Sequence, residues 1–285
     1  MKSSFFQSPS SLNCNGTLID ISTPRIMGIV NITPDSFYAK SRTAEADFVE
    51  QVQTHLEAGA SIIDIGAIST RPKANLYDTE TEKDRLKTIL PLVKKHFPKI
   101  CFSLDTFRAD VARWAVEDYG IAMINDVSAG DLDEMMFRTV ADLQVPYCMM
   151  HMQGIPETMQ DNPQYDDVTQ EIIEYFAPKV MQLQRLGVND ILLDPGFGFG
   201  KTLNHNYELL SHLSDFRLFE LPLLVGVSRK SMVFRLLDTT PEEALNGTTA
   251  VHVLALLGGA SVLRVHDVKE AREAIRIVQK YKEFD

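Results

Sequence analysis

Short apolar runs rich in β-branched residues alternate along the chain with longer segments in which apolar residues recur every three to four positions. The first pattern is typical of buried strands and the second of amphipathic helices. Strands are predicted at residues 26–32, 62–65, 100–104, 121–124, 145–150, 191–193, 223–227 and 262–265. Helices are predicted at residues 44–58, 79–96, 108–118, 132–143, 168–186, 203–213, 241–257 and 268–281.

This alternation predicts a parallel sheet, because helices are the usual crossovers between parallel strands. Eight such units predict a single (β/α)8 barrel, for which 285 residues is an ordinary length. A doubly wound open sheet is the alternative, since periodicity does not say whether a sheet closes. Residues 12–21 resemble a hairpin turning at Asn15-Gly16, which we expect to close the bottom of the barrel. The expected division is a leader and hairpin at 1–24 and a barrel at 25–285.

Polar residues follow the predicted strands, and in a barrel these strand ends meet on one rim. They are Asn31, Asp64, Asp105, Asn125, Asp126, His151, Asp194, Ser228, Arg229, Lys230, Arg264 and His266. Taken alone, each has a simpler explanation; Asp105, for example, precedes Thr106 and a helix and could serve only as a cap. Their repetition at every strand favours a site on the rim.

The segment from Asp194 to Lys201 places a carboxylate at a strand end, followed by three glycines that alternate with other residues. Such glycines let the backbone approach a flat ligand, and Phe197 and Phe199 supply aromatic walls. It is not a phosphate-binding P-loop, because Pro195 stands where that motif needs glycine. It is not a dinucleotide fingerprint either, because Lys201 replaces the third glycine.

Composition narrows the class of partner. A net charge of −11 and a pI near 5.1 argue against nucleic acid or a membrane surface. Three separated cysteines, Cys14, Cys101 and Cys148, lack metal-ligand spacing and are interpreted as reduced thiols. The start of the chain has too short an apolar core for a signal peptide, and no later apolar run is long enough to span a membrane. We therefore expect a cytoplasmic protein acting on small molecules.

Residues from the first, second and last strands form a candidate anion site. Asn31 ends the first strand, and the second leads to Ser69-Thr70-Arg71-Pro72. Arg264 and His266 are two positions apart and point to the same side of the last strand. Cations, a hydroxyl and an amide oxygen together suit a diphosphate bound with a divalent metal. The simpler alternatives are an ion pair of Arg264 with a neighbouring helix and a helix-capping role for His266.

Eight sequence blocks, in order, resemble the dihydropteroate synthase family. They are residues 27–37, 64–66 with 69–72, 103–106, 124–126, 150–154, 194–201, 228–231 and 264–268. The resemblance implies a homodimeric barrel that joins a dihydropterin-methyl diphosphate to p-aminobenzoate and releases diphosphate with the help of Mg²⁺.

The resemblance also implies a role for each matching residue. It assigns the pterin ring to Asp105, Asn125, Asp194 and Lys230, and the metal to Asn31. It assigns the diphosphate to Asn31, Thr70, Arg71, Arg264 and His266. It assigns the aminobenzoate to Phe37, Thr70, Pro72, Phe199 and Ser231. The catalytic residues it implies are Asp35, Lys230, Arg71, Arg264 and His266. In the implied mechanism the diphosphate leaves first, and Asp35 helps to stabilise the pterin-methyl cation.

Three departures from the family pattern bear on two loops. The chain has Tyr38-Ala39-Lys40-Ser41 where an Asp-Gly-Gly-like turn is usual, Ala67-Ile68 in place of Gly-Glu, and Lys73 in place of glycine. They leave open a catalytically silent pterin-binding paralogue. A folate-dependent methyltransferase is the other alternative; it would share the pterin pocket but would not use residues 69–72 or 264–266.

Overall fold

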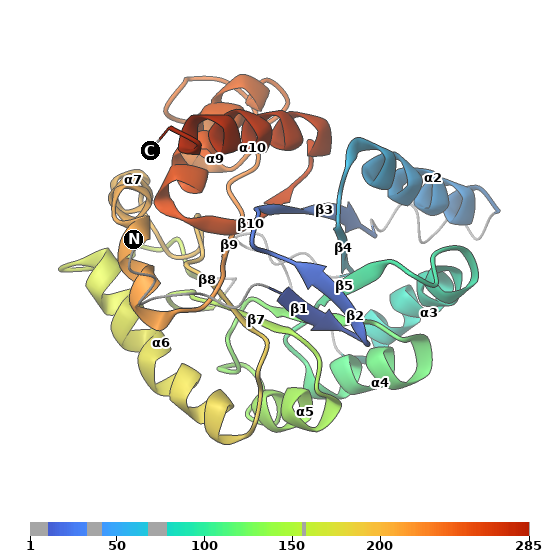
Figure 1. Ribbon diagram of the computed structural model, residues 1–285. Helices are drawn as coiled ribbons and strands as arrows, with labels where there is room; N and C mark the ends of the chain where they lie inside the picture. Colours follow the sequence, from blue (N-terminus) through green and yellow to red (C-terminus); the bar gives the residue numbers. More distant parts are fainter. Residues whose placement is uncertain (1–10, 33–41, 68–78, 156–157, 285) are drawn as a thin grey trace.

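The computed structural model describes residues 11–32, 42–67, 79–155 and 158–284, and within them eight parallel strands form a closed barrel (Figure 1). The strands are β3 (Arg25–Asn31), β4 (Ile62–Gly66), β5 (Cys101–Asp105), β6 (Met123–Asp126), β7 (Tyr147–Met150), β8 (Ile191–Asp194), β9 (Leu223–Val225) and β10 (Ala260–Val265). The barrel closes where β10 pairs with β3, with Arg264 opposite Met27. The predicted barrel is confirmed, and the open-sheet alternative is wrong.

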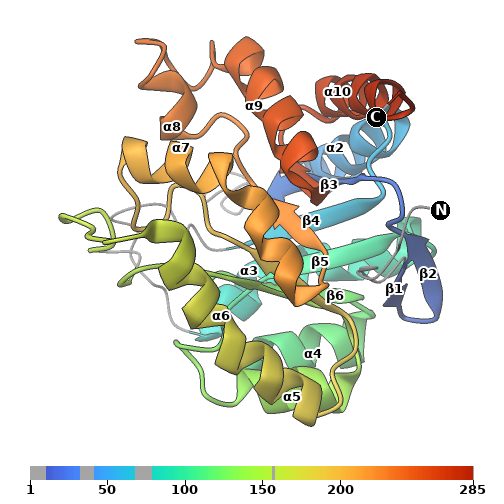
Figure 2. The ribbon, with the colours of Figure 1, turned by 60° about the vertical axis from the view of Figure 1, so that its left-hand side comes forward.

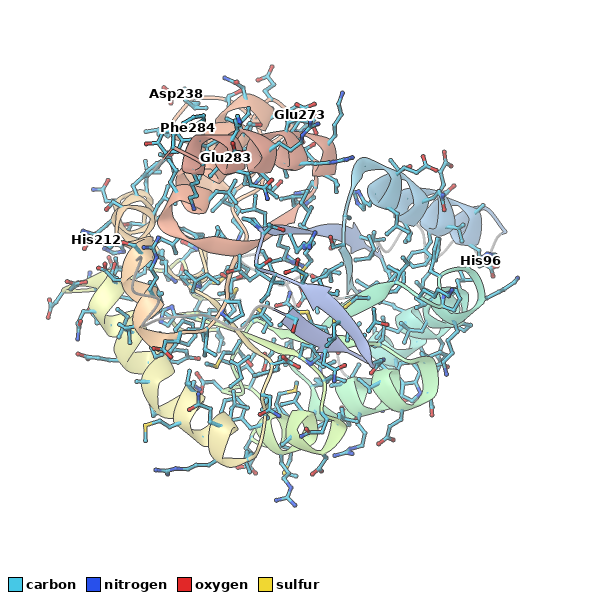
Figure 3. The ribbon with its side chains drawn as sticks, in the orientation of Figure 1. His96, His212, Asp238, Glu273, Glu283 and Phe284 are labelled. Carbon is cyan, nitrogen blue, oxygen red and sulfur yellow. The ribbon has the colours of Figure 1, made fainter. Side chains whose placement is uncertain are left out.

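Helices surround the barrel on its outer side (Figure 1). They are α2 (Arg42–Ala58), α3 (Thr79–His96), α4 (Ala109–Tyr119), α5 (Met136–Leu143), α6 (Val168–Arg185), α7 (Leu203–Ser211), α8 (Ser231–Phe234), α9 (Leu245–Gly258) and α10 (Val268–Lys282), with a 3₁₀ helix η1 (Leu213–Phe219). Labelled side chains such as His212 and Glu273 lie on the outer surface (Figure 3). No helix in the described ranges is both long and apolar enough to cross a membrane.

Two predicted helices begin four residues later than expected. The helix predicted from residue 241 begins at Leu245. Before it, the guanidinium of Arg229 donates hydrogen bonds to the carbonyl oxygens of Pro241 (2.8 Å) and Glu242 (2.6 Å). The one predicted from residue 132 begins at Met136, after a turn in which the Asp133 carboxylate accepts from the Met135 backbone N–H (3.0 Å). In both cases side-chain bonds hold a turn where periodicity suggested a helix.

The N-terminal hairpin closes the lower end of the barrel, as predicted. Strands β1 (Ser11–Cys14) and β2 (Thr17–Asp20) turn through Asn15 and Gly16 at φ values of 50° and 82°, as a tight two-residue hairpin turn requires. Leu12 is fully buried and packs in one cluster with Met27 and Ile62, near the start of their strands. In Figure 2 the hairpin lies at one end of the barrel. The carboxyl ends of the strands are therefore at the opposite end.

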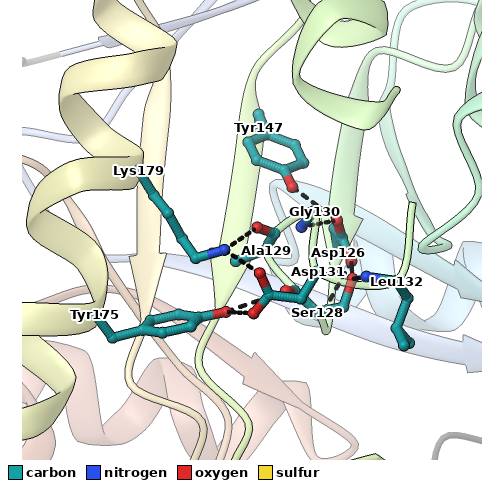
Figure 4. A network of polar contacts seen from close by, with 9 residues as sticks. All are labelled: Asp126, Ser128, Ala129, Gly130, Asp131, Leu132, Tyr147, Tyr175 and Lys179. Carbon is teal, nitrogen blue, oxygen red and sulfur yellow. Dashed lines mark hydrogen bonds and ion pairs between the residues drawn. The ribbon is translucent and has the colours of Figure 1, made fainter. Parts of the chain in front are cut away.

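At that opposite end, Asp126 is a fully buried carboxylate at the close of β6 (Figure 4). Its Oδ1 accepts from the Ser128 backbone N–H (2.8 Å) and hydroxyl (2.7 Å). Its Oδ2 accepts from the Gly130 backbone N–H (2.9 Å) and the Tyr147 hydroxyl (2.7 Å). Burial raises the pKa of Asp126, and these bonds act against that shift. Asp126 thus organises the turn after β6 and ties it to β7.

Replacing Tyr147 with phenylalanine should destabilise the fold by about 1–3 kcal/mol, because a buried acceptor would lose its donor. Urea unfolding followed by circular dichroism measures the change. Tyr281→Phe is the matched control, since Tyr281 lies 58 % exposed on α10 and should unfold like the wild type. Equal stability of Tyr147→Phe and Tyr281→Phe would contradict this view of the network.

Candidate active site

A buried group of charges lies at the carboxyl ends of β4, β5 and β10. Arg264 donates through Nε to Asp64 Oδ2 (2.7 Å) and through Nη2 to Asp105 Oδ2 (2.9 Å). Burial acts to lower the pKa of Arg264, but the carboxylates of Asp64 and Asp105 outweigh it and raise that pKa. Arg264 thus forms an ion pair, as the simpler alternative predicted, but its partners are two carboxylates on strands and not a residue of a neighbouring helix. This ion pair also places Arg264 beside the residues predicted to bind the pterin.

Asp105 and Asn125 are neighbours across β5 and β6, paired in register. Asn125 Nδ2 donates to Asp64 Oδ2 at 3.2 Å. Burial raises the pKa of Asp105 to about 7; Arg264 opposes that shift and Asp64 adds to it. A ligand with N–H donors would favour the ionised form of the Asp105 carboxyl.

Lys230 reaches the glycine-rich loop that follows β8. Its Nζ donates to the Phe197 carbonyl oxygen (2.5 Å) and lies 4.6 Å from the centre of the Phe199 ring. Burial lowers the pKa of Lys230 to about 8, with Asp194 acting in the opposite direction. Asp194 Oδ1 accepts from the Gly196 backbone N–H at 2.8 Å. Lys230, Asp194 and Phe199 thus lie in one region.

The glycine-rich loop is pressed against the chain that follows β7. Gly196 has φ 72°, and a Cβ there would lie 1.8 Å from the His151 carbonyl oxygen. At Gly200 a Cβ would lie 2.6 Å from the Gln153 carbonyl oxygen. Side chains are excluded at both positions, so these glycines are explained by close backbone packing.

Lys201 holds this loop in place, a role that sequence reasoning missed. It is 3 % exposed, and its Nζ donates to the carbonyl oxygens of Gly196 (3.0 Å) and Phe199 (3.1 Å). The same Nζ lies 3.0 Å from His151 Nδ1. Burial and the nearby Lys201 lower the pKa of His151 well below its ordinary value. The signal in the sequence is a lysine directly after closely spaced glycines, a pattern that the comparison with nucleotide motifs does not explain.

The loops after β9 and β10 are joined by side chains. Ser228 Oγ accepts from the His266 backbone N–H (3.2 Å) and lies 3.1 Å from His266 Nδ1. Arg229, with φ 53°, forms a two-pronged ion pair with Asp267 at 2.8 and 2.9 Å. These contacts hold Lys230 and His266 on neighbouring loops. The exposed His266 contacts Ser228, whereas Arg264 points into the barrel, so the two predicted diphosphate ligands have different surroundings.

The remaining predicted ligands lie at the rim or outside the described residues. Asn31 is exposed at the end of β3, and a Cβ at Gly66 would lie 3.1 Å from its Oδ1. Ser231 is half-buried at the first position of α8. Asp35, Phe37, Thr70, Arg71 and Pro72 lie outside the described residues, as do residues 38–41, Ile68 and Lys73.

Comparison with known proteins defines the class of this barrel. A family model described as pterin binding enzyme matches residues 27–266, and the chain belongs to this family. Relatives of the chain include dihydropteroate synthases. That of Escherichia coli K12 is 43% identical over 272 residues, covering 94% of this chain and 95% of the relative. That of Haemophilus influenzae is 38% identical, covering 94% and 98%.

Solved structures agree with this assignment. The Yersinia pestis dihydropteroate synthase with a sulfonamide drug complex has a TM-score of 0.87 and 40% identity, covering 96% of this chain and 99% of that one. The Xanthomonas albilineans enzyme with 4-aminobenzoic acid has a TM-score of 0.86 and 37% identity, covering 97% and 99%. The Xanthomonas albilineans enzyme with 7,8-dihydropteroate has a TM-score of 0.81 and 33% identity, covering 96% and 99%.

The buried Lys201 generates a pH-dependent prediction. Burial lowers its pKa to about 7 in the folded protein, against an ordinary value of 10.5. Between these values the unfolded chain binds a proton that the folded protein does not, so this lysine adds stability as the pH rises. We therefore compare the free energy of unfolding of the wild type with that of Lys201→Met. Between pH 6.5 and 9.5 this difference should shift by about 3 kcal/mol in favour of the wild type.

Urea unfolding of both proteins at the two pH values measures the gain. Lys99→Met, at an exposed position, is the control and should show no such change. A gap between wild type and Lys201→Met that is the same at both pH values would show that Lys201 is not desolvated as described.

Proposed function

We propose that the protein is a dihydropteroate synthase, condensing (7,8-dihydropterin-6-yl)methyl diphosphate with p-aminobenzoate to give 7,8-dihydropteroate and diphosphate in folate biosynthesis. The observation that carries the proposal is the buried polar group at one rim, where Asp105, Asn125 and Arg264 meet within a barrel related to these enzymes over nearly its whole length. Carboxylate and amide groups enclosed in this way suit a flat ligand edge rich in hydrogen-bonding atoms.

The proposed pterin ligands are Asp105, Asn125, Asp194 and Lys230. A buried carboxylate accepts two hydrogen bonds from an amino group and an adjacent ring N–H, as a pterin edge offers. Lys230 supplies a donor for a ring carbonyl or nitrogen; its Nζ already donates to the Phe197 carbonyl oxygen. Burial lowers the pKa of Lys230 to about 8. An anion or a hydrogen-bond acceptor bound beside Lys230 would favour its charged form.

The proposed diphosphate ligands are Asn31, Thr70, Arg71, Arg264 and His266. Arg264 contacts its two carboxylates through Nε and Nη2, so the N–H groups of its Nη1 can also bind an anion. His266 lies exposed at the rim, where its ring can meet a phosphate group. Arg71 and Thr70 are proposed from the family resemblance.

Mg²⁺ is the proposed cofactor, held by Asn31. An amide oxygen is a hard ligand of the kind that Mg²⁺ accepts, and Asn31 presents it at the open rim. Within the described ranges, no three histidine, cysteine or carboxylate side chains gather as a metal site. The single amide oxygen of Asn31 fits an ion that takes its other ligands from diphosphate and water. Such an ion would neutralise charge on the leaving group.

In the proposed reaction the bond between the pterin methylene and the diphosphate oxygen breaks first, and the electron pair leaves with the diphosphate. Arg71, Arg264 and His266 stabilise the charge that develops on it. The aminobenzoate nitrogen then forms the new bond to the methylene and loses a proton to solvent. Asp35 stabilises the cationic intermediate, and no covalent bond to the enzyme forms. Phe37, Thr70, Pro72, Phe199 and Ser231 are the proposed aminobenzoate ligands.

A diphosphate-release assay tests this function. With (7,8-dihydropterin-6-yl)methyl diphosphate and Mg²⁺, added p-aminobenzoate should yield equal amounts of diphosphate and 7,8-dihydropteroate. Asp194→Asn should lower kcat/KM at least about tenfold, because a buried acceptor becomes partly a donor. Pterin binding with no release of diphosphate would instead identify the silent paralogue, which the departure at residues 38–41 favours.

We also propose a cytoplasmic location. The three cysteines, Cys14, Cys101 and Cys148, are buried free thiols. Free thiols fit a compartment that keeps cysteines reduced.

The protein is proposed to form a homodimer through α9. This helix carries no Asp, Glu, Lys or Arg, and its exposed positions Asn246, Ala250, Leu254 and Leu257 follow one face. Leu254 is 50 % exposed although the protein as a whole is strongly acidic. An uncharged face can meet its own copy about a two-fold axis without like-charge repulsion, which favours a second copy of the chain as the partner.

Leu254→Glu should therefore convert a dimer into a monomer, because two carboxylates would face each other across the two-fold axis. Sedimentation velocity measures the change. Met181→Glu is the control: Met181 is 51 % exposed on α6, and this variant should remain dimeric. A dimer that persists in Leu254→Glu would exclude α9 as the interface.

A further inference from the structure

Asp64 is a completely buried carboxylate whose two oxygens are used very differently. Its Oδ2 accepts from Asn125 Nδ2 (3.2 Å) and Arg264 Nε (2.7 Å). Its Oδ1 is enclosed and, within the described part of the chain, has no hydrogen-bond partner. An unpaired buried oxygen lowers stability, so a residue selected for stability alone would not be expected here. This mismatch points to a role in the neighbouring pocket.

The first consequence of Asp64 concerns the amide of Asn125. An ionised carboxylate only accepts hydrogen bonds, so Asn125 must turn its Nδ2 toward Asp64. A flip of the amide would bring two oxygens together. Among the described residues, Asn125 Oδ1 receives no hydrogen bond, and it is not one of the enclosed unpaired atoms. Oδ1 is therefore the acceptor that Asn125 offers to a ligand.

The second consequence concerns Arg264. Its Nε is bound to Asp64 and its Nη2 to Asp105, two carboxylates on neighbouring strands. Bonds from two nitrogens fix the plane of a guanidinium, which a single bond would leave free to turn. The bond to Asp64 thus holds Arg264 beside the Asp105 carboxylate, at the edge of the space that the proposed function gives to the pterin.

We propose that Asp64 is a positioning residue that sets the hydrogen-bond polarity of this pocket: by holding the Asn125 amide and the Arg264 guanidinium, it makes Asn125 an acceptor and selects ligand edges that carry N–H donors. The inference rests on the proposed function, because a pterin has such an edge in its amino group and ring N–H. Asp64 itself, being fully enclosed, acts through its neighbours.

A double-mutant cycle tests the proposal by isothermal titration calorimetry with 6-hydroxymethylpterin. Asp64→Leu removes the acceptor, frees the Asn125 amide to turn and should weaken binding at least about tenfold. Asn125→Asp places two carboxylates together and should also weaken binding. The double variant Asp64→Leu with Asn125→Asp restores an acceptor toward the ligand without the clash, so it should bind at least about tenfold more tightly than Asp64→Leu.

Thermal unfolding separates this role from a structural one. Asp64→Leu should unfold earlier than the wild type, because Asn125 Nδ2 and Arg264 Nε lose their buried acceptor. The control Tyr147→Phe should also unfold earlier yet bind the pterin within about threefold of the wild type, since Tyr147 contacts Asp126 and lies outside the pocket. Loss of binding in Asp64→Leu is then not a consequence of lower stability.

Other outcomes overturn the proposal. Wild-type affinity in Asp64→Leu, or no recovery in the double variant, would show that Asp64 does not set the orientation of Asn125. If either result accompanied normal turnover by the wild type, the proposed function would stand and the role of Asp64 would be wrong. If the wild type bound no pterin, the proposed function would be wrong as well.

Discussion

Closure of the barrel by hydrogen bonds between β10 and β3 is the constraint on which the site depends. That pairing sets Arg264 opposite Met27 and carries its side chain to the carboxylates of Asp64 and Asp105, 200 and 159 positions earlier in the chain. An open sheet would leave β10 at an edge, away from β4 and β5. The charge group therefore exists only because the first and last strands meet.

Burial of this charge group is costly, and the structure offsets the cost only in part. The two bonds of Arg264 compensate its desolvation and raise its pKa. Asp105 remains poorly stabilised as an anion, with a pKa near 7, and Asp64 keeps one oxygen without a partner in the described chain. Free energy left uncompensated in this way is available to a ligand that supplies the missing donors. The same polar groups that lower the stability of the fold can thus strengthen the binding of a ligand.

A second set of contacts fixes the loops around the pocket. Lys201 donates hydrogen bonds to two carbonyl oxygens of the glycine-rich loop. Lys230, which follows β9, donates to the Phe197 carbonyl oxygen of the same loop. The ion pair of Arg229 with Asp267 joins the loops after β9 and β10. These anchoring side chains are buried or half-buried, so they hold the loops from within the fold. Rigid placement of this kind suits a site that must align two substrates.

The sequence by itself determined the barrel, the hairpin beneath it and the side of the sheet on which the polar residues gather. Periodicity and strand-end position are local properties, and a parallel barrel turns them directly into one rim. Only the tertiary structure decided that Asp64 binds Arg264 and Asn125, that Lys201 supports a loop, and that the segment before α9 is a turn held by Arg229. Those contacts join residues distant in the chain, and their geometry depends on strand register and rotamers, which no local pattern encodes.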